Sequence, residues 1–448
     1  MNGRAFLVVV GVVILAGLVT LVTRTGRPLQ PLLLDDGPSF VEVAEHLLKN
    51  GALPPMELRP PLYPLVLAAF MAISPAPALR YVVLFQAACW IVSAVLVATL
   101  VHQLSGGALP AALAGIAYTT LSQSQFFVRL IYAETVTIAL SLAAAVALGA
   151  ALRRADTSGS RWRWLAAGLA TGAAYGRPVF QVLLPLFGAL VLVDALVRGR
   201  PWARRVLPFA AAFVIALAPW YVLHKVVRGA AFFTKGPGYT LTNYLGDRRL
   251  LGHFPPAYAE VERAYAARFA AKPEQRYVGW WELYADWPKL YQARTGAPLP
   301  GDLIDSDMRR TATAVLLHNP RYWATRWPET WREFSTHPGW SPKGDFSPIR
   351  LAWPGWYVFF TYLGLWLPAA ILAAEILLQR SGRGPDVARL VPIATFVSIA
   401  LVNTAMEPWP GQVRYRAGID GFLVAAVVSL AAASVRAVGP WRTGGQEH

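Results

Sequence analysis

Two adjacent carboxylates, Asp35 and Asp36, directly follow the first long apolar segment, in the stretch LLLDDGPSF (32–40). A carboxylate that faces a cavity at a membrane surface can act as a general base, because it can take the proton from an attacking hydroxyl. A solvated pair at the start of a helix is the alternative, since the helix dipole favours negative charge there. The local pattern leaves both interpretations open.

Several basic residues could hold an anion, because their side chains form strong charge-assisted hydrogen bonds with anionic groups. Each one alone could also be an interfacial residue whose long side chain reaches out of the bilayer. Short outer loops are normally poor in arginine, however, so anion binding explains the whole set better. Glu134, at the start of a span, either pairs with one of these cations or contacts an acceptor. The cations are Arg59, Arg129, Arg177, Lys225, Arg228, Arg414 and Arg416.

The elements that carry these residues are apolar. Of the 448 residues 55% are hydrophobic and 15% are charged, and repeated segments are long enough to cross a bilayer, which indicates an all-α polytopic membrane protein. Most arginines lie in short loops, so the net charge of +16 indicates topology and no nucleic-acid partner. The single Cys89 excludes a disulfide framework. We predict about ten spans, at 5–23, 78–104, 110–126, 133–152, 164–177, 178–197, 206–223, 351–378, 388–404 and 417–436.

The segment 61–75 decides the topology, because it is apolar but short and begins with prolines. If it does not cross, the arginine-rich loops 153–163, 198–205 and 379–389 all lie on the cytoplasmic side, as the positive-inside rule requires. If it crosses, all three violate that rule. We therefore predict that 61–75 stays at the outer surface and that both termini lie inside, with 5–23 as a retained signal anchor.

Two outer regions follow from this topology. One is 24–77, with the two aspartates, and the other is 224–350, a loop too long for a simple connector. Within the second, the spacing at 258–271 predicts a helix, and RYWATRWPETWREF (321–334) predicts an amphipathic helix on the membrane surface. We divide the chain into an N-terminal membrane module (1–223), an extracytoplasmic cap (224–350), and C-terminal membrane helices with a short cytoplasmic tail (351–448).

The first outer loop predicts a helix of its own. Ser39 and Glu42 have the spacing of a capping box, and Asn50-Gly51 is a typical helix end. The two aspartates then stand just before the N-terminus of an amphipathic helix that lies along the membrane. Its apolar face consists of Phe40, Val43, Ala44, Leu47 and Leu48.

These residues resemble the first loop of the GT-C glycosyltransferases, in particular the branch of protein O-mannosyltransferases and aminoarabinose transferases. Asp36 stands four residues before the aromatic Phe40, and the amphipathic helix that ends in KNG is followed by the basic-proline stretch RPPLYPLVLAAF (59–70). The resemblance covers residues 5–436 in order. Its further segments are LIYAETVTIAL (130–140), AAGLATGAAYGRPVFQVLLP (166–185), LAPWYVLHKVVRGAAFFTKGPGYTL (217–241) and VRYRAGIDGF (413–422).

The resemblance implies a bundle of transmembrane helices, roofed by juxtamembrane helices, with an active site outside the cytoplasmic (inner) membrane. It also implies the reaction, in which a sugar passes from a polyprenyl-phosphate carrier to a protein, lipid or glycan acceptor. By position, Asp36 is the base and Arg59 the basic residue of the basic-proline motif. The second acidic residue of the family falls on Gly37, a departure for which Asp35 could substitute.

Other signals are weaker. IDSDM (304–308) contains the Asp-x-Asp by which nucleotide-sugar transferases hold a metal, but it lies outside the membrane without a β-α-β pattern, so a helix cap by Asp305 or Ser306 explains it better. Tyr239 and Asn243 could contact a sugar or simply pack. A divalent cation between carboxylates is allowed in principle, but we predict no metal ligand set and no other cofactor.

Two other functions stay open. A transporter or flippase of lipid-linked precursors would also need arginines near a lipid phosphate, but no inverted repeat is visible and the polar residues gather on one face, not at the midplane. A non-catalytic subunit of a cell-envelope assembly is compatible with the departure at Gly37. The function that we predict is a glycosyltransferase that uses Asp36 as its base.

Overall fold

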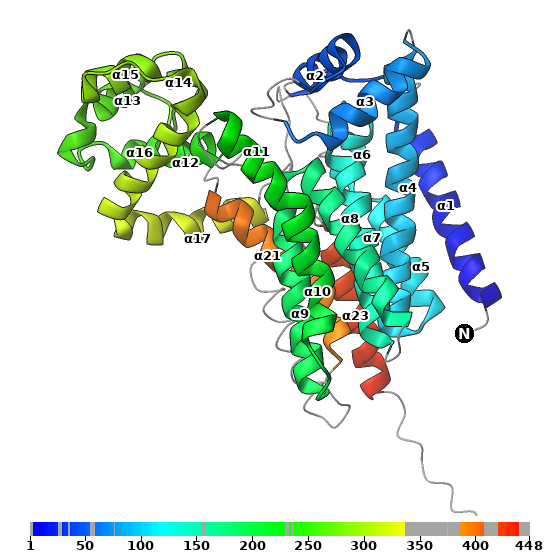
Figure 1. The fold of residues 1–448 in the computed structure, drawn as a ribbon. Helices are drawn as coiled ribbons and strands as arrows, with labels where there is room; N and C mark the ends of the chain where they lie inside the picture. Colours follow the sequence, from blue (N-terminus) through cyan, green and yellow to red (C-terminus); the bar gives the residue numbers. More distant parts are fainter. Residues whose placement is uncertain are drawn as a thin grey trace, which may run out of the picture.

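The structure, a computed structural model, is built from helices (Figure 1). Within the residues that it describes, every regular element is a helix, and extended pairing is limited to two isolated bridges. The predicted all-α fold is therefore confirmed for this part of the chain. The described residues are 3–25, 29–34, 36–53, 59–75, 77–154, 158–228, 233, 237–336, 374, 386–406 and 420–438.

The largest part of the molecule is a bundle whose helices run back and forth between two ends (Figure 1). At one end lie α2 and α3, and at the opposite end α1 begins and α23 ends. The described helices of this part are α1 (Gly3–Thr25), α2 (Gly37–Asn50), α3 (Leu62–Ile73), α4 (Ala78–Ser105), α5 (Ala108–Thr119), α6 (Ser122–Arg129), α7 (Glu134–Arg153), α8 (Ser158–Gly176), α9 (Leu183–Val197), α10 (Ala203–Ala212), α11 (Ala218–Arg228), α21 (Leu390–Met406) and α23 (Asp420–Val438).

Residues 237–336 form a second helical unit, which lies toward the same end of the bundle as α2 (Figure 1). It has its own hydrophobic core, which includes the buried side chains of Tyr265, Trp287 and Met308. The predictions of helices at 258–271 and 321–334 are confirmed as α13 and α17. The helices of the unit are α12 (Pro237–Leu245), α13 (Ala259–Ala271), α14 (Trp281–Tyr284), α15 (Trp287–Thr295), α16 (Ile304–His318) and α17 (Pro320–Thr336).

The length and apolar character of the helices are those of a multi-pass membrane protein. Among the described residues, five helical segments are long and apolar enough to cross a bilayer: Arg4–Thr23, Ala78–Ser105, Glu134–Arg153, Pro178–Val197 and Ala203–Val226. By contrast, α3 has 12 residues, a length of about 18 Å that falls short of a hydrocarbon core of about 30 Å. The predicted span 351–378 lies outside the described residues except for residue 374, so the total of about ten spans stays a prediction.

The prediction of one continuous span at 110–126 is wrong, because this segment is divided between α5 and α6. The hydroxyls of Thr119 and Thr120 each bond to a carbonyl of the preceding turn at 2.7 Å, and Leu121 is extended. Side-chain bonds to the backbone compete with helical bonds, which explains why the helix stops here.

The span predicted at 206–223 is present but irregular. A π-helical turn, η2 (Phe213–Leu217), joins α10 to α11, and Pro219 is the second residue of α11. Since proline has no N–H to donate, the wider turn accommodates it without ending the helix.

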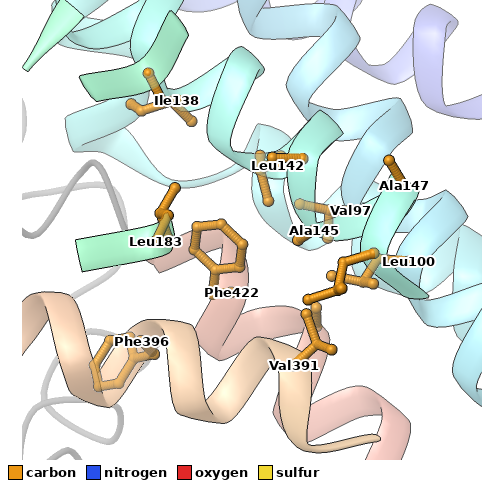
Figure 2. Close-up of a cluster of buried hydrophobic side chains, with 14 of the residues drawn as sticks. Val97, Leu100, Ile138, Leu142, Ala145, Ala147, Leu183, Val391, Phe396 and Phe422 are labelled. Atoms are coloured by element: carbon orange, nitrogen blue, oxygen red, sulfur yellow. The ribbon is translucent and has the colours of Figure 1, made fainter. Parts of the chain in front are cut away.

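Helices α4, α7, α9, α21 and α23 meet in one core (Figure 2). Figure 2 shows Leu142 of α7, Leu183 of α9 and Phe422 of α23 gathered at its centre, and all three are at most slightly exposed. Along α7 and α8 the contact is made largely by alanines that are fully buried, such as Ala144 and Ala170. Small side chains allow the two helix backbones to approach closely. This close contact positions the ends of α7 and α8 at which the candidate active site lies.

The end of α7, the segment between α9 and α10 and the described residues before α21 carry arginines, and all three lie at the end of the bundle opposite α2 (Figure 1). Arg153, at the end of α7, pairs with Asp386 at 3.4 Å, and Arg198, after α9, pairs with Asp194 at 2.8 Å. This is the arrangement predicted if 61–75 does not cross.

Candidate active site

The segment around Asp36 is fastened to the chain that leads into α7. The Leu32 amide donates to the Arg129 carbonyl at 2.8 Å, and the Ile131 amide donates to the Leu32 carbonyl at 3.2 Å. The amide of Asp36 donates to the Tyr132 hydroxyl at 3.1 Å, which itself donates to the Leu34 carbonyl at 3.0 Å. Contacts between distant parts of the chain therefore position Asp36.

The predicted capping box is wrong, because α2 starts before Ser39. The helix begins at Gly37 with Asp36 at the N-cap position and without a side-chain cap bond, and the Ser39 hydroxyl donates to the Asp36 carbonyl at 2.7 Å. Pro38 explains the early start, since proline fits the first turn of a helix. The predicted end is confirmed, as Gly51 has a φ of 67° and its amide bonds to the Leu47 carbonyl.

The buried face of α2 is narrower than predicted. Phe40 and Ala44 are buried, Val43 and Leu47 are partly buried, and Leu48 is 47% exposed. Only the positions next to α3 and the Tyr132 segment are covered, because these are the partners that α2 meets.

Arg59 holds the carboxylate of Asp36. One guanidinium nitrogen lies 2.6 Å from Asp36 Oδ1, and Nε donates to the Ser39 hydroxyl at 2.8 Å. The guanidinium carbon lies 5.0 Å from the centre of the Phe40 ring, which itself packs edge-on against Tyr63. The side chains of Arg59 and Asp36 are 21% and 24% exposed, so the ion pair is still accessible to solvent.

A second ion pair joins Glu134 and Arg177, at the ends of α7 and α8. Glu134 lies in the first turn of α7, where the helix dipole favours a carboxylate, and it is 4% exposed. Pairing was one of the two roles predicted for Glu134. Gly176 allows this approach, because a Cβ there would lie 2.2 Å from the Thr137 hydroxyl of α7.

Both ion pairs lie where the first outer loop meets the ends of α7 and α8. The Cβ position of Gly37 is 3.6 Å from the Ile131 carbonyl oxygen, and the Cβ position of Gly176 is 3.5 Å from the Leu62 side chain. At Gly37 the nearest heavy atom to an added Cβ would be 3.5 Å away, an ordinary contact. Steric crowding therefore does not explain why glycine replaces the acidic residue there.

The sequence interpretation missed a buried residue that supports the site. Gln86 of α4 donates to the carbonyls of Val128 and Leu130 at 2.8 Å each, and it accepts a hydrogen bond from the Tyr63 hydroxyl of α3. Burial raises the pKa of Tyr63 well above its ordinary value, so this hydroxyl stays protonated and can donate. A glutamine inside an apolar segment was the signal that could have revealed this role.

The remaining predicted residues are spread more widely. Arg129 donates to the Gln30 carbonyl at 3.4 Å beside the first loop, and Lys225 is an exposed residue of α11. Asp35, Arg414 and Arg416 lie outside the described residues.

Tyr239 lies in the core of the second helical unit and is 3% exposed. Its ring stacks on Trp280 at 4.7 Å, and the side-chain oxygen of Asn243 accepts the Trp280 amide at 3.1 Å. These contacts are packing contacts, and a role in substrate binding stays a prediction.

The Asp-x-Asp stretch has a structural role, but a different one from the cap that we predicted. Helix α16 begins at Ile304, with Leu303 at the N-cap position. Asp305 accepts the amide of Tyr239 in the first turn of α12 at 3.2 Å, and Asp307 accepts from Trp287 at 2.9 Å and from Arg294 at 2.6 Å. Both carboxylates thus connect neighbouring helices of the unit.

The described carboxylates near the site, Asp36 and Glu134, are each paired with an arginine. Among the residues that the structure describes, no group of three or more His, Cys, Asp or Glu side chains is placed to hold a metal ion. Asp36 and Glu134 each contact an arginine, whose charge would repel a divalent cation. The chemistry below is assigned to side chains alone.

Comparison with known proteins finds likeness in structure only, since no protein-family model and no curated protein matches the chain. One similar structure is the archaeal oligosaccharyltransferase AglB from Archaeoglobus fulgidus in complex with an inhibitory peptide and a dolichol-phosphate, with a TM-score of 0.48 and 12% identity over 96% of this chain and 52% of that one. A second structure of the A. fulgidus oligosaccharyltransferase, with Zn and sulfate, has a TM-score of 0.42 and 10% identity over 94% of this chain and 53% of that one.

ArnT from Cupriavidus metallidurans bound to undecaprenyl phosphate has a TM-score of 0.40 and 14% identity over 97% of this chain and 79% of that one. The chain spans about half the length of the oligosaccharyltransferases that it matches.

Proposed function

We propose that the protein is a glycosyltransferase that moves a sugar from a polyprenyl-phosphate donor to an acceptor on the outer face of the cytoplasmic membrane. The observation that carries the proposal is the ion pair of Asp36 and Arg59, held over the ends of α7 and α8 beside Glu134 and Arg177. Asp36 and Arg59 are the acidic and the basic residue of the two motifs on which the sequence resemblance rests.

In the reaction, Asp36 takes the proton of the acceptor hydroxyl as its oxygen forms a bond to the anomeric carbon of the sugar. The bond between that carbon and the phosphate oxygen breaks, and the polyprenyl phosphate leaves with the electron pair. A phosphate is already a good leaving group, so the site needs cations near it and no protonated acid.

Arg59 has two roles in this proposal. It holds the carboxylate of Asp36 in one direction, and it brings positive charge close to the position of the leaving phosphate. Arg129, Arg177, Lys225, Arg414 and Arg416 are the further candidates for phosphate binding. Arg177 is paired with Glu134, and the negative charge of that carboxylate offsets part of the attraction that Arg177 exerts on a phosphate.

The second helical unit is the proposed selector of the acceptor. It belongs to the proposed extracytoplasmic cap, 224–350, and lies toward the same end of the bundle as α2 (Figure 1). The membrane parts on either side, 1–223 and 351–448, would then form the donor path within the lipid.

The test is transfer of radiolabelled sugar from a panel of polyprenyl-phosphate donors by the purified full-length protein. We expect wild type to transfer from at least one donor and Asp36→Asn to lose about a hundredfold or more of the rate. Glu42→Gln, on the exposed face of the same helix, is the matched control and should keep the wild-type rate.

Other outcomes would replace the proposal. Full activity of Asp36→Asn would exclude Asp36 as the base. Movement of intact lipid-linked sugar between leaflets, without transfer, would identify a flippase. Donor binding without either activity, together with co-purification of envelope enzymes, would indicate a non-catalytic subunit.

A further inference from the structure

The end of the bundle opposite the candidate active site carries a dense group of arginines. They come from the end of α7, the first part of α8, the loop between α9 and α10, the first turn of α10, and the 3₁₀ turn η6 (Val387–Arg389). We call the following six residues the arginine cluster: Arg153, Arg163, Arg198, Arg200, Arg205 and Arg389.

Two aspartates tie this cluster together. Asp194, which is 1% exposed, lies 2.8 Å from Arg198 and 4.0 Å from Arg200, and it also interacts with Arg205. Asp386 lies 3.4 Å from Arg153 and 3.5 Å from Arg389. Six arginines and two aspartates leave an excess of four positive charges within this group. Topology alone requires arginines on this side of the membrane, but not that they converge.

Arg163 is the member of the arginine cluster whose buried charge lacks a hydrogen-bonded partner among the described residues. Its side chain is 7% exposed, and Arg205 repels its charge while Asp194 attracts it. Among the described residues, no hydrogen bond or ion pair to Arg163 is formed, and its Nε is buried without a partner. The indole N–H of the adjacent Trp162 is also buried without a partner. A buried cation beside another cation is costly unless an anion compensates it.

The surroundings of the cluster favour a lipid as the source of that anion. Trp164 and Trp202 are 47% and 53% exposed, and tryptophan side chains are typical of the headgroup level of a bilayer. Apolar side chains on the same helix ends are exposed as well, as acyl chains would require: Leu165, Leu196, Val197 and Leu207. A free phosphate ion would make no use of them.

We propose that the arginine cluster is a binding site for the phosphate of an anionic phospholipid, with the phosphate beside Arg163 and Arg205 and the acyl chains against the exposed apolar side chains. The lipid would bridge the helix ends that Asp194 and Asp386 hold together. This site is at the opposite end of the bundle from Asp36 and does not depend on the proposed reaction.

The test is native mass spectrometry of the full chain released from mixed micelles of phosphatidylglycerol and phosphatidylcholine. We expect wild type to retain phosphatidylglycerol preferentially. The double variant Arg163→Gln/Arg205→Gln should lose about thirtyfold in affinity, or about 2 kcal/mol, because each basic residue near an anionic headgroup contributes about 1 kcal/mol. Arg163→Lys, which keeps the charge, should retain most of the preference.

The matched control is Arg309→Gln/Arg310→Gln, which removes the same charge from exposed positions on α16. It should bind lipid as wild type does, and size-exclusion chromatography checks that all variants fold. Equal retention of both lipids by wild type, or an equal loss in the control, would overturn the proposal. A rise in melting temperature with inorganic phosphate as large as with phosphatidylglycerol would replace the lipid by a soluble anion.

Discussion

The two ends of the helical bundle handle charge in different ways. At the end with α2, two arginines are each paired with one carboxylate, Arg59 with Asp36 and Arg177 with Glu134. At the other end five arginines interact with only two aspartates, Asp194 and Asp386. A one-to-one pair orients an individual carboxylate, whereas an excess of arginine over carboxylate attracts an anion. The first arrangement suits a reactive group and the second suits a binding surface.

The two ion pairs at the end with α2 differ in how deeply they are buried. Glu134 is 4% exposed and Arg177 is 17% exposed, whereas Asp36 and Arg59 are each more than 20% exposed. The deeper pair is expected to hold the ends of α7 and α8 together, and the shallower pair to meet the substrate. Stability and activity should therefore separate between the two pairs.

The largest expected loss of stability is in Glu134→Gln, which removes the carboxylate charge that faces Arg177 while the guanidinium stays largely buried. We expect a loss of about 3–5 kcal/mol in the free energy of unfolding, measured by denaturation in detergent micelles. The double variant Glu134→Gln/Arg177→Gln should lose less, because neither charge is then left alone. A double variant that is less stable than Glu134→Gln would contradict the explanation that an uncompensated buried charge causes the loss.

A smaller loss, about 1–3 kcal/mol, is expected for Gly176→Ala, because the new Cβ would overlap the Thr137 hydroxyl. The separation of α8 from α7 should also displace Arg177 and lower sugar transfer. Gly168→Ala on the same helix is the control, since a Cβ there meets nothing within 4 Å. Adding Thr137→Ala should restore part of the stability, and no recovery would contradict the steric explanation.

The second helical unit, which belongs to the proposed extracytoplasmic cap, offers matched charges that a change of pH can test. Burial raises the pKa of Asp247, but hydrogen bonds from Arg249 outweigh it, and the pKa of Asp247 is below its ordinary value. The pKa of Glu329 is lowered as well, chiefly by its hydrogen bonds with Arg249. Carboxyls with a lowered pKa stabilise the fold above their unfolded pKa of about 4, and this contribution disappears as pH falls through the folded value.

We therefore expect amide hydrogen exchange in residues 237–336 to quicken as the pH is lowered through this range, after correction for the intrinsic rate. Asp247→Asn should flatten the pH dependence. Asp286→Asn, whose pair with Arg268 is 42% exposed on both sides, should leave it unchanged. A pH dependence that survives in Asp247→Asn would assign it to other groups.

The smallest effect is expected at the arginine-rich end, for Arg153→Gln. Its pair with Asp386 is about one third exposed on both sides, so the loss of stability should be below about 1 kcal/mol. Thermal unfolding of the same set of variants measures it. A loss of stability as large as that of Glu134→Gln would contradict the expected difference in ion-pair strength between the two ends of the bundle.

Local pattern predicted the elements well and the contacts between them poorly. The end of α2 at Gly51, the short α3 and the helices at 258–271 and 321–334 follow from spacing and turn residues, as does the gathering of arginines at one end. The pairing of Glu134 was expected without a specific partner. That partner, Arg177, is reached only because Gly176 lets two helices approach, and spacing along the chain does not encode such an approach.

The errors have the same origin. Ser39 looked like a cap but lies inside the first turn, where its hydroxyl meets Arg59, a residue twenty positions away. Tyr132, which holds the amide of Asp36, is 96 positions away and gave no local signal. Gln86 is conspicuous as a glutamine in an apolar segment, but its partners could not be predicted. They are set by the packing of α3, α4 and the chain before α7.

The central claim is that Asp36 acts in the chemical step while Arg59 and its neighbours bind the donor phosphate. Single-turnover transfer and donor binding, measured on the same preparation of Asp36→Asn, test it most directly. The account predicts donor affinity close to that of wild type and a rate lower by about a hundredfold or more. A wild-type rate, or a rate that falls only because the donor no longer binds, would contradict it.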